Sequence, residues 1–116
     1  MNTHAGRKLG RPTGARMSLL RGLTVSLFRH EQLRTTVAKA KELSRYADGV
    51  LALAKTKTLE NRRRVAAEIN DKEVRKKIYD VLVPRYQTRS GGCTRLNRLG
   101  ARAGDNAEIA LVRLVQ

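Results

Sequence analysis

Apolar side chains recur at spacings of three and four residues through most of the chain, which predicts helices. The first predicted helix runs from about Thr13 to Arg29, after Pro12, and its apolar stripe consists of Met17, Leu20, Leu23, Leu27 and Phe28. Arg29 falls opposite that stripe and Arg21 lies at its edge, whereas Arg16 lies in line with it. We therefore expect Arg16 to leave the core at the end of the helix.

Three further helices follow from the same spacing. Thr36 is the expected N-cap of the second helix and Thr58 that of the third, while a polar pair at 70–71 separates the third from a fourth. The second helix is predicted to be the central core helix because it has the longest apolar stripe: Val37, Ala40, Leu43, Ala47, Val50, Leu51 and Ala54. The fourth should end or kink near Val83, because Pro84 disfavours the helical conformation in the residue before it.

The pattern changes after the fourth helix. Thr94–Leu99 and Glu108–Val115 flank a glycine- and aspartate-containing turn at Gly100–Asn106, which predicts a β-hairpin. His30–Thr35 is a further short strand. The predicted fold class is therefore α+β, with four helices packed on a small three-stranded sheet that ends in a β-hairpin. Residues 13–116 form this single domain, and the polar residues 1–12 precede it as a basic N-terminal arm.

Charge narrows the choice of partner. The chain has 25 Lys and Arg against 10 Asp and Glu, a net charge of +15, so its working state is expected to be neutralised by a polyanion. Nucleic acid fits best, because every contacted phosphate releases counterions. Met1–His30 and Val81–Gly104 contain basic residues and no acid, whereas the middle of the chain is mixed. A membrane surface is a weaker alternative because no Trp/Phe-rich helix face is present.

The stretch RSGGCTRLNRLGARAGD, Arg89–Asp105, raises three chemical possibilities. A phosphate-binding loop for nucleotides would precede a helix and contain GK[ST], but GGCT leads into a strand. A metal site would have to combine Cys93 with His4 and His30, which have no paired ligand spacing. A cysteine nucleophile would need a nearby base, so we interpret Cys93 as a small buried residue. No enzymatic activity, cofactor, metal or small-molecule substrate is expected.

Arginines and glycines in this stretch favour phosphate contacts instead, because glycines let backbone N–H groups approach an anion closely. Strand alternation places Arg95 and Arg98 on opposite faces, so a solvated hairpin edge that discourages aggregation is the alternative. In the run Arg62–Arg64, three successive helical positions cannot all face one partner. The four aromatic residues do not cluster on a strand, so we expect recognition of a folded RNA by its backbone and shape.

Several segments resemble a known family. They are GRKLGR near the start, RTTVAKAKELSRYAD, and NDKEVRKKIYDVLVPRYQTRSGGCTRLNRLGARAGDNAEIALVRL. Together they are similar to the bacterial-type large-subunit ribosomal protein of family seventeen, from about Gly6 to Val115. The resemblance implies a non-enzymatic α+β domain bound to large-subunit rRNA near the outer mouth of the nascent-chain exit tunnel, beside neighbouring large-subunit proteins. The family commonly has tyrosine at the position of Cys93.

The resemblance also implies that the basic N-terminal segment enters RNA. The full set of predicted RNA-binding residues is Arg7, Lys8, Arg11, Arg16, Arg21, Arg62, Arg63, Arg89, Thr94, Arg95, Arg98 and Arg102. A basic DNA-binding architectural protein remains the alternative, although no helix shows a polar base-reading face. One cysteine and no long apolar run favour a cytoplasmic location. The resemblance implies that this location is the ribosome, with an organellar ribosome left open.

Overall fold

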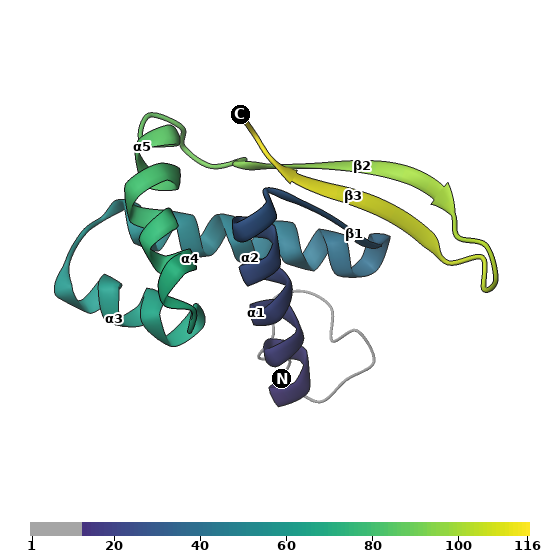
Figure 1. Ribbon diagram of the computed structural model, residues 1–116, viewed down its shortest axis with the longest axis horizontal. Coiled ribbons are helices and arrows are strands. Elements are labelled where there is room, and N and C mark those ends of the chain that lie inside the picture. The colour runs from purple at the N-terminus through teal and green to yellow at the C-terminus, as the bar shows by residue number, and fades with distance from the viewer. Residues whose placement is uncertain (1–12) are drawn as a thin grey trace, which may run out of the picture.

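The computed structural model describes residues 13–116, which form four helical segments and one sheet (Figure 1). The first three helices are α1 (Thr13–His30), α2 (Val37–Lys55) and α3 (Leu59–Glu68). The fourth helical segment consists of α4 (Lys72–Lys77), a π-helical turn η1 (Ile78–Leu82) and α5 (Val83–Arg85). The strands are β1 (Gln32–Thr36), β2 (Thr94–Ala101) and β3 (Glu108–Leu114). The predicted α+β fold is confirmed.

The sheet is antiparallel, with β3 in the centre between β1 and β2. Val112 of β3 lies opposite Leu33 of β1 and Leu96 of β2, so these three side chains share the face that packs against the helices. Helices α1 and α2 contact that face, and the β2–β3 hairpin extends beyond them at one end of the molecule (Figure 1). A register shift between Arg98 and Gly100 bends the hairpin where it leaves the helices.

Helix α2 lies at the centre of the core, as its long apolar stripe predicts. All seven residues of that stripe are buried, and they pack in one cluster with the inward side chains of β3, Ala110, Val112 and Leu114. Period-3.6 spacing on α2 and period-2 spacing on β3 each produce one apolar face, and both faces are removed from water by the same contact. The hydrophobic cluster therefore fixes how the sheet sits on the helices.

The starts of α3 and α4 follow local side-chain chemistry, at the predicted cap Thr58 and at Asp71 of the polar pair 70–71. The Thr58 hydroxyl accepts a hydrogen bond from the Asn61 amide at 3.1 Å, and the Asp71 carboxylate accepts one from the Val74 amide at 3.1 Å. Thr36 occupies the N-cap position of α2 but makes no such side-chain bond. Thr36 is also the last residue of β1 and lies opposite Ile109. Its pairing with β3 therefore sets the direction of the chain where α2 begins.

The sequence predicts that the fourth helix ends or kinks near Val83, and the structure shows an irregular turn there while the helical segment continues through Pro84 to Arg85. A π-helical turn precedes the proline, and the Val83 amide donates to the Ile78 carbonyl, five residues earlier. In a regular α-helix the proline ring would collide with the carbonyl of the residue four positions before it. A widened turn relieves that collision, so the helix is irregular near Val83 without stopping there.

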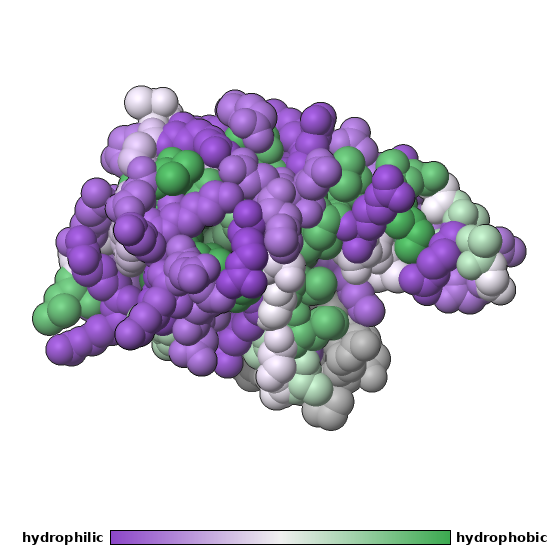
Figure 2. Space-filling model, in the orientation of Figure 1, coloured by the Kyte–Doolittle hydropathy of each residue, from purple (hydrophilic) through white to green (hydrophobic). Residues whose placement is uncertain are grey.

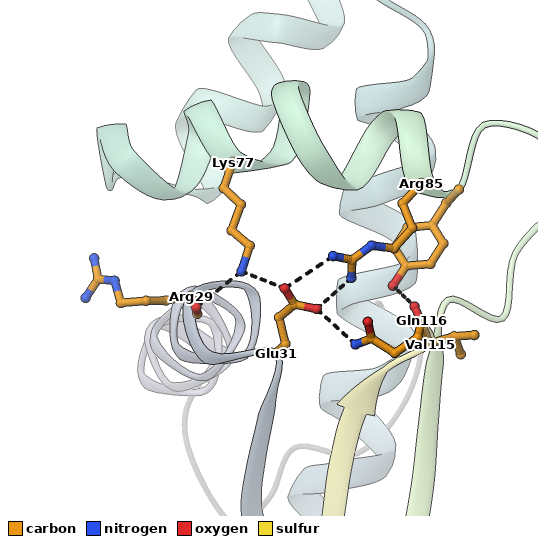
Figure 3. A network of polar contacts seen from close by, with 7 residues as sticks. Arg29, Glu31, Lys77, Arg85, Val115 and Gln116 are labelled. Carbon is orange, nitrogen blue, oxygen red and sulfur yellow. Dashed lines mark hydrogen bonds and ion pairs between the residues drawn. The ribbon is translucent and has the colours of Figure 1, made fainter.

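Glu31 ends α1 and connects three parts of the fold (Figure 3). Its backbone has a φ of 65°, and its amide donates to the Leu27 carbonyl at 2.7 Å. Its carboxylate accepts hydrogen bonds from Arg85 at 2.6 and 3.3 Å and from Gln116 at 3.3 Å, and lies 3.1 Å from the Lys77 ammonium. The hydrogen bonds from Arg85 outweigh partial burial and, together with Lys77, lower the pKa of Glu31 to about 2.

Candidate nucleic-acid interface

The arginines of α1 are engaged by carboxylates from other helices. Arg21 donates through Nε to Glu68 at 2.9 Å, and Arg29 pairs with Asp71 at the N-cap of α4. Arg16 donates to Glu42 of α2 at 3.3 Å, and the two residues are only 6% and 4% exposed. The expectation that Arg16 leaves the core is therefore wrong, because an acid on α2 pairs with its charge inside the protein. These contacts hold α1 against the three helical segments that follow.

The three arginines of α3 have different surroundings, which agrees with the prediction that they cannot share one partner. The Arg62 guanidinium lies 5.2 Å from the centroid of the Tyr79 ring, within the range of a cation–π contact. Arg64 pairs with Glu60 at 2.9 Å along the exposed side of the helix. Arg63 is exposed, and no ion pair with it is found among residues 13–116. Helix α3 lies at the opposite end of the molecule from the hairpin tip (Figure 1).

Both arginines near the hairpin tip have acidic neighbours. Arg98 lies 3.4 Å from Glu108, and Arg102 donates to both carboxylate oxygens of Asp105, at 2.6 and 3.1 Å. The hydrogen bond from Arg102 and that from the Ala107 amide lower the pKa of Asp105. The sequence from Val81 to Gly104 contains no acid, but the turn brings the acids that follow it back against these arginines. The hairpin tip is therefore less positive than its sequence predicts.

Side chains hydrogen-bond to the backbone carbonyls of the loop at residues 87–93, which precedes β2. The Lys55 ammonium donates to the Arg89 carbonyl, and Arg89 Nε donates to the Gly92 carbonyl at 3.1 Å. Gly91 and Gly92 have φ values of 132° and 63°, a conformation that glycine adopts without a steric penalty. Together with Asp48, this loop lines a shallow pocket of about 380 Å³. Arg89 thus presents its side chain beside exposed glycine backbone.

Cys93 and Thr94 face inward. Cys93 is 1% exposed, which confirms its interpretation as a small buried residue; burial, followed by the nearby Asp48 carboxylate, raises the pKa of its thiol. Asp48 also accepts a hydrogen bond from the Cys93 amide at 3.1 Å. Thr94 is 6% exposed, and its hydroxyl is hydrogen-bonded to Ser44 of α2. The Thr94 side chain therefore packs on the helices rather than facing solvent.

The face of the sheet turned away from the helices carries three exposed arginines, one on each strand. We call this the open sheet face; its residues are Gln32, Arg34, Arg95, Asn97, Leu111 and Arg113. Arg95 lies directly opposite Arg113, and Arg34 lies opposite Leu111. Among the described residues, no carboxylate forms an ion pair with any of these three arginines. This is an uncompensated positive surface.

Comparison with known proteins identifies the family. Residues 19–115 match the family described as Ribosomal protein L17. The large ribosomal subunit protein bL17 of Endomicrobium trichonymphae is 45% identical over 115 residues, which is 99% of this chain and 98% of the relative. The chain belongs to the ribosomal protein L17 family. The corresponding proteins of Anaeromyxobacter sp. (strain Fw109-5) and Anaeromyxobacter dehalogenans (strain 2CP-C) are each 46% identical over 110 residues, which is 95% of this chain and 66% and 68% of theirs.

Membership in the L17 family confirms the ribosomal prediction. The family consists of non-enzymatic structural constituents of the large ribosomal subunit, which decides against both the DNA-binding alternative and an enzyme. Within residues 13–116, no cluster of three or more His, Cys, Asp or Glu is arranged to hold a metal ion. In the same part of the chain, no helix is both long and apolar enough to cross a membrane.

The structure of this L17 family member adds residues that the sequence prediction missed. Arg7, Lys8 and Arg11, the predicted contacts of the basic arm, lie outside the described residues. Arg34 and Arg113 were not predicted, yet they share the open sheet face with Arg95. The alternation of Ile109, Leu111 and Arg113 against buried neighbours was the available signal for Arg113. For Arg34, only the strand pairing of β1 with β3 reveals the grouping.

Proposed function

We propose that this chain binds large-subunit rRNA through phosphate and shape contacts, near the outer mouth of the nascent-chain exit tunnel and beside other large-subunit proteins. The observation that carries the RNA contact is the uncompensated charge of the exposed arginines, above all Arg95 opposite Arg113. A surface of this kind gains free energy when phosphates replace its counterions. The location near the tunnel is supported by the family resemblance alone.

The predicted contact residues differ in how well their surroundings support a phosphate contact. Arg63 and Arg95 are exposed without an ion pair among the described residues, and Arg62 and Arg89 keep cationic groups at the surface beside Tyr79 and Gly92. Arg98 and Arg102 are already paired with Glu108 and Asp105. Either arginine would have to leave its carboxylate, or bind it and a phosphate at the same time, to contact RNA. Arg21 has a similar constraint through Glu68.

The remaining predicted contacts stand on other grounds. Arg16 and Thr94 are buried, so contact with RNA there would need local rearrangement, and the proposal does not use them. Arg7, Lys8 and Arg11 rest on their charge and on the family resemblance. They stay predictions for the basic arm.

The aromatic residues support recognition by shape rather than by base stacking. Phe28 and Tyr86 are buried, while Tyr46 and Tyr79 are partly buried in or beside helices. A sheet that stacks bases needs aromatic rings on its exposed face, and the open sheet face has none. Contact with the sugar–phosphate backbone of folded RNA is the mode that remains.

A salt titration tests the RNA contact. We expect the affinity of the full chain for deproteinised large-subunit rRNA to fall on the order of 10³-fold between low and moderate salt, as expected for six or more phosphate contacts. An affinity that does not depend on salt would contradict the electrostatic account. Cross-links between the chain and rRNA in assembled subunits test the location, and cross-links confined to regions distant from the tunnel mouth would refute it.

A further inference from the structure

The open sheet face places like charges together at an energetic cost. Arg95 and Arg113 are directly opposed across β2 and β3, and like charges at such positions repel each other. Arg34 is on β1, two positions along from Gln32, which lies opposite Arg113. Arg34 is therefore a diagonal neighbour of Arg113, at ~7–8 Å between Cα atoms. The free protein therefore carries three guanidinium groups on one face, with Arg113 next to each of the other two, and the described residues supply no ion-paired carboxylate for any of them.

Edge protection applies to Arg34 and Arg95, which are on the edge strands β1 and β2, but it does not explain Arg113. Charges that discourage aggregation act at edge strands, where backbone groups are unpaired. Arg113, however, is on the central strand β3, whose backbone groups are paired on both sides. The neighbouring exposed arginines Arg98 and Arg102 both have carboxylate partners, so this chain does neutralise arginines elsewhere on the hairpin. Within the hairpin, Arg95 and Arg113 of the open sheet face are therefore the arginines without a carboxylate partner among the described residues.

We infer that the open sheet face is a main docking surface for the phosphate backbone of folded rRNA, with Arg34, Arg95 and Arg113 as its contacts. The inference rests on the proposed RNA-binding function and names the surface that performs it. Charge complementarity decides the occupant: three planar guanidinium groups with free donors match phosphate oxygens, which accept two parallel hydrogen bonds from one arginine.

Polar and apolar neighbours on the face fit the same occupant. Gln32 and Asn97 flank the arginines and offer side-chain amides to sugar and phosphate oxygens. Beyond Arg34 the face continues into a hollow of about 400 Å³ beside the register shift, lined by Arg34, Thr35, Leu99, Gly100, Ala101, Arg102 and Ile109. A sheet face with a depressed end accommodates the convex side of an RNA backbone better than a flat surface does.

Matched triple variants of the full chain test the inference. The test variant combines Arg34→Gln, Arg95→Gln and Arg113→Gln, and the control combines Arg29→Gln, Arg45→Gln and Arg64→Gln. Both remove three exposed arginine charges, but the control positions are on the helices α1, α2 and α3 rather than on the open sheet face, and Arg29 and Arg64 have ion pairs in the free protein. With deproteinised large-subunit rRNA, we expect the slope of log affinity against log salt to fall by about 2–3 in the test variant and by less than about 1 in the control.

The outcomes separate this inference from the proposed function. A steep salt dependence in the unmodified chain with equal losses in the two variants would overturn the open sheet face while leaving RNA binding intact. A test variant that binds free rRNA normally but fails to enter subunits would also overturn it, in favour of an acidic partner protein. A flat dependence in the unmodified chain would instead remove the proposed function itself.

A second measurement does not depend on how the variants fold. Arginine-directed modification of the unmodified chain, read by peptide mass spectrometry, should label Arg34, Arg95 and Arg113 in the free protein. Bound rRNA should protect these three at least about tenfold more than Arg64. Arg64 pairs with Glu60 on α3, and α3 lies at the opposite end of the molecule from the hairpin tip. Equal protection at all four positions would contradict a preferred docking face.

Discussion

Helix α1 and the open sheet face both display three arginines, yet their surroundings are opposite. Arg16, Arg21 and Arg29 of α1 each contact a carboxylate on α2, on α3 or at the start of α4. Arg34, Arg95 and Arg113 of the open sheet face contact none among the described residues. Arginines of the first kind join elements of the fold, whereas those of the second kind leave charge for a partner.

Hydrophilic side chains cover most of the face drawn in Figure 2, with smaller apolar patches between them both at the helical end and toward the hairpin. Charge alone thus does not separate a structural surface from a binding surface. The distance to the nearest carboxylate does distinguish the arginines of α1 from those of the open sheet face, and that distance is set by the fold.

The buried pair of α1 gives the largest expected effect. We expect Glu42→Gln to lower the free energy of unfolding by about 3 kcal/mol, because it withdraws a charged partner from the buried guanidinium of Arg16. The matched control Glu60→Gln removes a carboxylate that is 73% exposed and should cost less than about 0.5 kcal/mol. Urea denaturation of the RNA-free protein measures both. Equal losses in the free energy of unfolding would show that the Arg16–Glu42 pair stabilises the fold no more than the surface pair of Arg64 and Glu60 does.

Glu31 should show the next largest effect and a pH signature. Its pKa is lowered to about 2, so the carboxylate stabilises the fold above its unfolded-state value of 4.5. That contribution is lost as pH falls from 4.5 through about 2. After allowance for partial solvent exposure, we expect Glu31→Gln to cost about 2 kcal/mol at neutral pH.

Stability measured between pH 5 and pH 2 tests this assignment, with those limits set by the two pKa values. The unmodified protein should lose more stability over that interval than the Glu31→Gln variant does. Glu73→Gln, which changes an exposed carboxylate on α4, is the control and should keep the full pH dependence. Parallel curves for all three proteins would mean that Glu31 does not connect α1 to Arg85 and Lys77 in solution.

Arg21 sharpens the comparison because the sequence predicts an RNA contact for it and the structure gives it an ion pair. A double-mutant cycle with Arg21→Ala and Glu68→Gln should give a coupling energy of about 0.5–1 kcal/mol, typical of a partly exposed pair. Arg21→Ala should lower the salt slope of rRNA binding by less than Arg95→Gln does. A decrease of about one full unit would place Arg21 among the RNA contacts instead.

The smallest effect has the opposite sign. We expect Arg113→Thr to raise the stability of the RNA-free protein by about 0.2–0.5 kcal/mol at low salt, because it removes the like-charge pair with Arg95 and places a β-branched residue in a strand. Added salt should reduce this gain by screening. Arg98→Thr, which loses the contact with Glu108, is the control and should show no gain in thermal melting. Destabilisation by Arg113→Thr would mean that Arg113 supports the fold.

Much of the architecture followed from local pattern. The stripe on α2, the cap at Thr58 and the alternation in β3 each act over a few residues, so periodicity and side-chain chemistry were enough to predict them. Pro84 predicted either an end or a kink near Val83 and could not decide between them, because a π-helical turn depends on how the helix packs on both sides of it.

By itself, the sequence determined the fold class, the central helix, the burial of Cys93 and the excess of positive charge. Only the tertiary structure decided which arginines remain without a carboxylate. Arg102 and Asp105 meet through a turn, Arg16 and Glu42 meet through helix packing across 26 positions, and Arg34 joins Arg95 and Arg113 through strand pairing. Electrostatic interaction depends on distance in space and on local burial, and segments distant in the chain set both.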